Sequence, residues 1–436
     1  MRKHITLLLL MSAVLTSMSA AAQERWSLEK CIQYAVDNNI SIKQQENTIE
    51  QNEIALNTAK MSYLPDLNAS ASQSWSFGRG LSIDNTYVNR NTSSTSFSLS
   101  TSVTLFDGLK TQNTVKLRKL NLEAATSDLK KAKEDISINV TSEYLQALYA
   151  DELLQVAKNQ VELSKAQLEQ KRKMAANGKA SESDVAQAKA QLAQDEMSVV
   201  QAQNDYNLAV LELSQLLELD SPESLVIELP DTSAQLLPIA SVEEVFTDAL
   251  KSKAIIQGDE IRIEQAEKNI SIARGSYSPT LYFSASVGSN YYKTTGYENA
   301  SFSDQMDQNL NKYIYLSLNV PIFNRFATRN EVRTARTQLE AQNLQLNSDK
   351  KALYKEVQQA YYNAVAAESK YGSCLSAEES AETAFRLMNK KYDVGKATQT
   401  EYNESRTQWM KAVADRIQSK YEYIFRAKIL DYYRGI

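Results

Sequence analysis

The chain has 436 residues, a formal net charge of −5 and 23% charged residues, and this composition disfavours a nucleic-acid partner. Its single histidine is His4, so the rest of the chain has no histidine to activate a nucleophile or bind a metal. The two cysteines, Cys31 and Cys374, are each predicted to be a buried free thiol, with a disulfide between them left open.

The first 22 residues have the pattern of a secretory signal peptide. Arg2 and Lys3 form a basic start, residues 5–15 are apolar, and three alanines at 20–22 form a small-residue cleavage site. No cysteine follows directly, so no lipid anchor is expected there. The later chain has no run of 18 apolar residues, so a membrane role would require strands instead of a helix.

The next residues predict one helix followed by two strands. Residues 27–62 are amphipathic, Ser27 is a suitable N-cap, and Pro65 ends the helix. Residues 66–77 and 95–106 then alternate apolar with hydroxyl side chains, which is typical of strands with one apolar face. The apolar positions are Leu67, Ala69, Ala71, Trp75 and Phe77 in the first strand, and Phe97, Leu99, Val103 and Leu105 in the second.

A long helix follows the second strand. It is predicted over residues 109–174 and ends in a turn at 175–181 around Gly178. A returning helix is expected to run to about Leu219. The segment 221–240 holds three prolines and reads as a linker that is neither rod nor strand.

The second half repeats the first. With an offset of 217 residues, Phe106-Asp107-Gly108 matches Phe323-Asn324-Arg325, and Asn177-Gly178-Lys179-Ala180 matches Val394-Gly395-Lys396-Ala397. The predicted organisation is therefore a first repeat at 23–220 and a second at 241–436. The second repeat has expected strands at 280–291 and 312–323 and a turn at 392–398.

The second long helix carries a seven-residue apolar repeat. Nine positions at this spacing are apolar: Val332, Leu339, Leu346, Leu353, Ala360, Ala367, Cys374, Ala381 and Met388. Such a repeat keeps one helix stripe facing a partner, so it predicts a coiled-coil-like rod. At 1.5 Å per residue the rod would extend roughly 85 Å.

The strands permit two interpretations. A soluble antiparallel sheet with one wet face is the simpler one. Strands of about ten residues, with small hydroxyl residues on one face and aromatic residues near the loops, fit a membrane barrel better. Four strands cannot close a barrel around water, and an open edge in lipid leaves backbone groups unpaired. Three copies would pool their strands into twelve.

Several motifs together carry a family resemblance. They are Trp26-Ser27-Leu28-Glu29-Lys30-Cys31-Ile32-Gln33-Tyr34-Ala35, Tyr63-Leu64-Pro65, Phe106-Asp107-Gly108 and the duplicated Gly-Lys-Ala turns. Their order, duplication and spacing resemble the TolC-type outer-membrane efflux channels over the whole chain after residue 22. The resemblance implies a mainly α-helical homotrimer with a 12-stranded β-barrel continued by a coiled-coil-like α-helical barrel. It also implies a passive exit duct through the outer membrane and periplasm.

The resemblance further implies partners and site residues. A periplasmic adaptor would dock on the tip turns, at Gly178, Lys179, Ala180, Gly395, Lys396 and Ala397. An inner-membrane transporter would be reached through that adaptor. Glu401 and Glu404 would form an acidic ring at the periplasmic entrance, and Tyr392 and Asp184 would link neighbouring helices. Ala397 occupies the position where the family has a basic residue, so no salt bridge is implied there.

Other interpretations remain. Thr398 and Glu401 form a capping box, Ser181 and Asp184 a close variant, and capping alone would explain these acids. The alternative function is a soluble periplasmic coiled-coil scaffold. An enzyme is disfavoured, and the sequence predicts no catalytic residue, cofactor or metal site. The exported substrate, the class of adaptor and transporter, and the resting state of the gate stay open.

Overall fold

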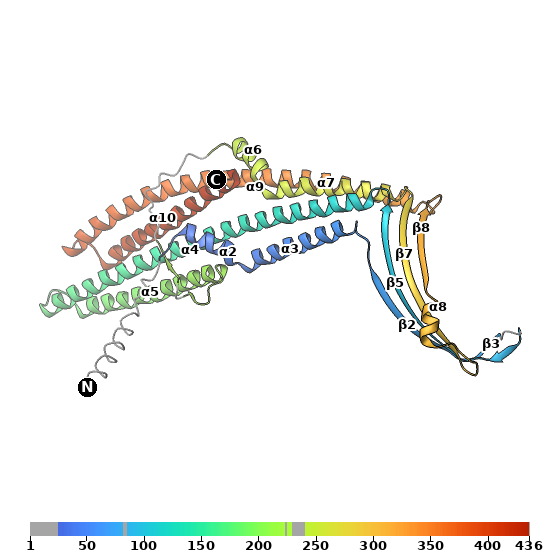
Figure 1. Cartoon of the computed structure of the whole chain (residues 1–436). Helices are drawn as coiled ribbons and strands as arrows, with labels where there is room; N and C mark the ends of the chain where they lie inside the picture. Colours follow the sequence, from blue (N-terminus) through green and yellow to red (C-terminus); the bar gives the residue numbers. More distant parts are fainter. Residues whose placement is uncertain (1–24, 82–84, 223–224, 229–239, 436) are drawn as a thin grey trace, which may run out of the picture. The chain divides into compact units, whose positions relative to one another are not determined.

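A computed structural model describes residues 25–81, 85–222, 225–228 and 240–435 (Figure 1). The predicted signal peptide and most of the predicted linker lie outside these ranges. No helix within them has both the length and the apolar character that a membrane crossing requires. The chain divides into two compact units: Met1–Glu46, Asp128–Ile256 and Ser348–Ile436 in one, and Asn47–Ser127 and Gln257–Asn347 in the other.

The first unit is built on two helical hairpins (Figure 1). Helix α4 (Lys110–Ala176) turns into α5 (Glu182–Leu216), and α9 (Ala327–Asp393) turns into α10 (Gln399–Arg434). Both long helices have 67 residues, as the 217-residue offset requires. Capping boxes start both returning helices, with the Ser181 and Thr398 side chains as N-caps.

The predicted single helix over 27–62 is wrong in one respect, because it breaks at Asn39. Helix α2 (Leu28–Asn38) starts on the Ser27 cap, and α3 (Ile40–Met61) follows the break. Asn39 has an extended backbone (ψ 131°), and its buried amide donates to the carbonyl of Leu216 at 3.3 Å. At the break, the N–H of Ile40 donates to the Glu218 carboxylate at 3.3 Å and the N–H of Ser41 donates to the Asn39 side-chain oxygen at 2.9 Å, so side chains replace the backbone acceptors that a continuous helix would supply.

The second repeat has the same break. Helix α6 (Val242–Ser252) ends at Lys253, whose backbone is also extended (ψ 125°), and α7 (Ala254–Gly275) follows. A side chain of quite different chemistry therefore stands at the matching position. Lys253 is buried, and its ammonium lies 3.7 Å from the carboxylate of Glu134.

The core of the first unit lies where α2 meets the hairpins. Cys31 and Ala35 of α2 pack with apolar residues of α4, α5 and α10, among them Tyr144, Leu213 and Ile417. All nine seven-residue repeat positions of α9 are buried or half-buried within one chain, so the predicted seam is confirmed. Cys374 is free and only half-buried, whereas Cys31 is free and fully buried.

The second unit contains a four-stranded antiparallel sheet in the order β2-β5-β7-β8 (Figure 1). The strands are β2 (Asn68–Ser76), β5 (Thr92–Phe106), β7 (Thr280–Thr294) and β8 (Asn311–Asn319). The register places serines opposite one another, and the hydroxyls of Ser70 and Ser98 lie 2.7 Å apart. Hydroxyl groups therefore do line one face of the sheet.

The predicted end of the last strand is wrong. β8 stops at Asn319, four residues before the predicted end at 323. Pro321 follows closely, and a proline has no N–H to donate to a neighbouring strand.

Some short elements were not predicted. β1 (Arg25–Trp26) pairs in parallel with β6 (Val226–Ile227), and β3 (Arg79–Leu81) pairs with β4 (Tyr87–Asn89). Helix α8 (Phe302–Gln308) lies against β7, where the Gln305 amide bonds to both the N–H and the carbonyl of Tyr292. This amide substitutes for a strand partner on that part of β7.

Candidate functional site

The two hairpin turns share one backbone geometry. Gly178 and Gly395 both have φ of +72°, which a residue with a Cβ adopts only at a cost. Behind each glycine, the next N–H bonds back to the helix, from Lys179 to Met174 and from Lys396 to Lys391, each at 2.8 Å. This is the Schellman arrangement, so glycine is required by the turn itself.

The residues predicted to dock an adaptor lie on these turns. Both glycines and both lysines, Lys179 and Lys396, are exposed, and Ala180 and Ala397 are half-buried. Each turn therefore presents one exposed lysine, and its other predicted docking residues are glycine and alanine.

The predicted gate acid Glu401 is engaged locally. Its carboxylate accepts from the backbone N–H of Thr398 at 2.7 Å and from the Thr398 hydroxyl at 2.8 Å. These bonds, the backbone bond foremost, hold the pKa of Glu401 below its usual value. Glu401 and Glu404 are both exposed, and as residues three apart on α10 they share one face.

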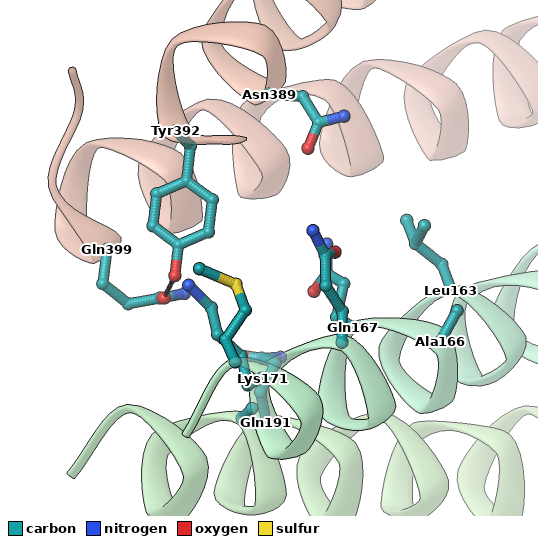
Figure 2. A pocket seen from close by; sticks show the side chains of 11 residues that line it. Leu163, Ala166, Gln167, Lys171, Gln191, Asn389, Tyr392 and Gln399 are labelled. Atoms are coloured by element: carbon teal, nitrogen blue, oxygen red, sulfur yellow. Dashed lines mark hydrogen bonds between the residues drawn. The ribbon is translucent and has the colours of Figure 1, made fainter. Parts of the chain in front are cut away.

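Asp184 and Tyr392 are also held within their own hairpins. Asp184 accepts from the N–H and the hydroxyl of Ser181, both at 2.8 Å, and these bonds lower its pKa. The Tyr392 hydroxyl donates to the side-chain oxygen of Gln399. Figure 2 shows that bond and, facing Tyr392 from the other hairpin, Lys171.

Lys171 was not predicted, and it lies close to both of these residues. Its ammonium nitrogen is 4.3 Å from the centre of the Tyr392 ring, within the range of a cation–π interaction. After the Ser181 bonds, the charge of Lys171 is a further cause that lowers the pKa of Asp184. Lysine is common on solvated helix faces, so its sequence context alone gave no signal for this position.

A small cavity separates the two hairpins beside Lys171 and Tyr392 (Figure 2). Its volume is about 200 Å³. Amide side chains line much of it, from both hairpins: Gln167, Gln170, Gln191, Asn389 and Gln399. Amides can donate and accept, and Lys171 adds one positive charge to the lining.

Aromatic rings fill the contact behind the cavity. The ring of Tyr402 stacks on that of Tyr392 with centroids 4.8 Å apart, and its hydroxyl accepts from Gln167 of α4. Phe385 stacks on Trp409 at 5.1 Å. Tyr402 is thus a buried link between the start of α10 and the first hairpin.

Four residues further along α10, Arg406 is buried as well. It forms an ion pair with Asp195 of α5 at 2.5 Å. Sequence reasoning missed it, although a signal exists: Tyr402, Trp409 and Val413 form an apolar stripe at helical spacing, and Arg406 interrupts it.

Within the described residues, no three side chains of His, Cys, Asp or Glu are grouped as a metal site would need.

A model of the family described as "Outer membrane efflux protein" matches residues 31–218 and 245–428, which spans both repeats. The chain belongs to the outer membrane efflux protein family. As a member, it is an efflux or secretion channel of the Gram-negative outer membrane, so that prediction is confirmed. The alternative of a soluble scaffold receives no support, and this is a family of channels, not of enzymes.

Relatives in the outer membrane efflux protein family are distant in sequence. TolC of Escherichia coli is 24% identical over 380 residues, which is 85% of this chain and 74% of TolC. CyaE of Bordetella pertussis is 21% identical over 308 residues, or 71% of this chain and 64% of CyaE.

Solved structures show the fold. The CmeC outer membrane channel of Campylobacter jejuni matches with a TM-score of 0.78 at 18% identity, covering 94% of this chain and 85% of CmeC. The open state of the MtrE outer membrane channel of Neisseria gonorrhoeae matches at 0.75 with 19% identity, covering 94% and 88%.

Proposed function

We propose that three copies of this chain form one passive exit duct, with their sheets pooled into a 12-stranded barrel. The observation that carries this proposal is the two-sided chemistry of the sheet. One face presents serine hydroxyls, and the other exposes apolar side chains such as Ile314 (81%) and Leu316 (62%). In a membrane barrel the serine face would line the water-filled interior and the apolar face would contact lipid.

The edges of the sheet support pooling. β2 and β8 lie at its two edges, and both have nine residues. An edge in lipid would leave N–H and carbonyl groups unpaired, at several kcal/mol for each group. Pairing β8 of one copy with β2 of the next removes all such edges at once.

The helices would continue the duct into the periplasm. Large apolar side chains are exposed on α5 and α9 in a single chain, including Val200, Leu344 and Tyr362. In a trimer, neighbouring copies would cover these side chains. In this arrangement the chain acts as two repeats, 23–220 and 241–436, joined by the linker 221–240.

The tip turns support the proposed partners. We place the docking site of a periplasmic adaptor at Gly178, Lys179 and Ala180 and at Gly395, Lys396 and Ala397. Support comes from the exposed lysines on both turns. The adaptor would connect the duct to an inner-membrane transporter, as part of a tripartite efflux or type I secretion system.

The gate would be acidic. Glu401 and Glu404 are exposed on one face of α10, and threefold symmetry would place six carboxylates around one entrance. Such a ring attracts cations and disfavours anions. Tyr392 and Asp184 would hold the neighbouring helices near the ring, with Lys171 between them.

The test is assembly and conductance of the full mature chain. Detergent-extracted protein should migrate as a heat-modifiable trimer and should conduct ions in planar bilayers. Divalent cations should block it from the side of the tip turns. A detergent-independent monomer that forms no channel would contradict the proposal.

A further inference from the structure

The side chain of Arg406 is surrounded by acceptors from two other helices. It is only 4% exposed, and its Nη2 donates to Asp195 of α5 at 2.5 Å and to Ser164 of α4 at 3.3 Å. With the Gln160 amide, also on α4, oriented so that its oxygen faces the guanidinium group, Nε of Arg406 donates to that oxygen at 2.7 Å. One guanidinium group therefore bonds to both helices of the other hairpin.

The partners are bonded to each other as well. The Ser164 hydroxyl donates to the same carboxylate oxygen of Asp195 that receives Arg406. The second oxygen of Asp195 accepts from Gln191 at 3.1 Å. Asp195, Ser164 and Gln160 are all buried, so the cluster is a closed polar network inside an apolar contact.

The two charges of this network depend on each other. Removing Arg406 or Asp195 alone leaves the other charge buried without its counter-charge, which costs far more than the intact pair contributes. A shift of the start of α10 on α4 and α5 would therefore break this buried pair.

The duplication makes the cluster specific to this contact. At the 217-residue offset, Gln160, Ser164 and Asp195 correspond to Ala377, Ala381 and Ala412. Arg406 corresponds to Lys189, which is exposed. The second repeat therefore has three small apolar residues where the first has the three acceptors, so the cluster does not belong to the repeated helical pattern.

The cluster acts on the helix that carries the gate acids. Tyr402 and Arg406 lie one turn apart on the buried face of α10, whereas Glu401 and Glu404 are exposed. We propose that Arg406, Asp195, Ser164 and Gln160 form a buried clamp that holds the first turns of α10 against the first hairpin and so positions Glu401 and Glu404. Arg406 is thus a positioning residue, and its effect on the gate rests on the proposed function.

The clamp can be tested apart from the gate. Arg406→Met should make amide hydrogens of residues 399–410 exchange on the order of a hundredfold faster, because Asp195 is left buried and charged. The double variant Asp195→Asn with Arg406→Met should recover part of this protection, since no charge is left unpaired. Lys189→Met, at the duplicated position, should exchange like the wild type. Unchanged exchange in Arg406→Met would overturn the clamp.

The gate is tested on the same purified trimers in planar bilayers. Arg406→Met should conduct more than the wild type and lose its block by divalent cations, and the double variant should recover part of the block. Faster exchange with an unchanged block would overturn the positioning role. If the wild type formed no channel, the proposed function would fail, and the exchange measurement would still decide on the clamp.

Discussion

The ammonium nitrogen of Lys171 lies 4.3 Å from the centre of the Tyr392 ring, so a cation on α4 faces an aromatic residue at the end of α9. The two residues belong to different hairpins and line the same cavity (Figure 2). The position that is basic in the family holds Ala397 in this chain. The cation beside Tyr392 belongs to the first hairpin.

Lys171→Met is expected to loosen the contact between the hairpins. It removes a cation–π interaction of about 1 kcal/mol from one face of the Tyr392 ring. Single-channel conductance should rise, whereas Lys171→Arg should retain most wild-type behaviour. Lys173→Met is the control, because Lys173 is exposed on the same helix. Equal conductance in Lys171→Met and Lys173→Met would exclude Lys171 from the gate.

Three variants distinguish the capping role of Glu401 from the contribution of Glu401 and Glu404 to the cation block. Thr398→Ala breaks the capping box without changing charge, so it should lower the unfolding temperature and leave the cation block intact. Glu404→Gln changes charge outside the capping box and should weaken the block with little effect on stability. Glu401→Gln should do both. If Thr398→Ala and Glu401→Gln behave identically in bilayers, capping alone explains Glu401.

Acid should weaken the same cap. The folded-state pKa of Glu401 is lowered, so its contribution to stability is present above the unfolded value of about 4.3 and is lost as pH falls through the folded value. The difference in unfolding temperature between the wild type and Glu401→Gln should therefore shrink at low pH. A difference that persists in strong acid would rule out the capping carboxylate as its source.

Lys253 should make stability rise with pH. Burial lowers its pKa to about 8, against the opposing effect of Glu134 and with Lys130 adding repulsion. Its pKa in the unfolded chain is about 10.4. Between about pH 8 and 10.4 the unfolded chain therefore binds more protons than the folded chain, so the free energy of unfolding rises with pH. From pH 8 to 9.5 the wild type should gain about 2 kcal/mol relative to Lys253→Met.

Chemical denaturation at a series of pH values measures that gain. The interval stays below pH 10 because burial also raises the pKa of the neighbouring Tyr433 to about 12, and tyrosine ionisation in the unfolded chain would then oppose the effect. A constant difference between wild type and Lys253→Met over the interval would show that burial does not lower the pKa of Lys253.

Local rules in the sequence predicted much of this structure. The caps at Ser27, Ser181 and Thr398 and the seam of α9 depend on residues near in sequence, and they occur where expected. The breaks at Asn39 and Lys253 depend on distant partners, Leu216 and Glu134, which no local pattern indicates. The candidate site follows the same division. The glycine turns were predictable, whereas Lys171 and Arg406 act through the other hairpin.

The two cysteines should differ sharply in reactivity. Burial raises the pKa of the Cys31 thiol to about 12, and its side chain is inaccessible, so a maleimide should not label it in the folded protein. Cys374 is half-buried and should react slowly in the monomer. Mass spectrometry after labelling decides this. Modification of Cys31 before unfolding would contradict the packing of α2 against the hairpins.

Gly108 should be intolerant of a side chain, whereas its counterpart Arg325 should tolerate losing one. Gly108 has φ of +71°, and a Cβ there would lie 2.5 Å from the carbonyl oxygen of Gly275. Gly108→Ala should therefore cost more than about 1 kcal/mol. Arg325 adopts a similar φ of +56° with its side chain in place, so Arg325→Gly should change stability by less than about 1 kcal/mol. Thermal unfolding in detergent compares the two, and equal effects would mean that the turn before α4 does not need the close approach to Gly275.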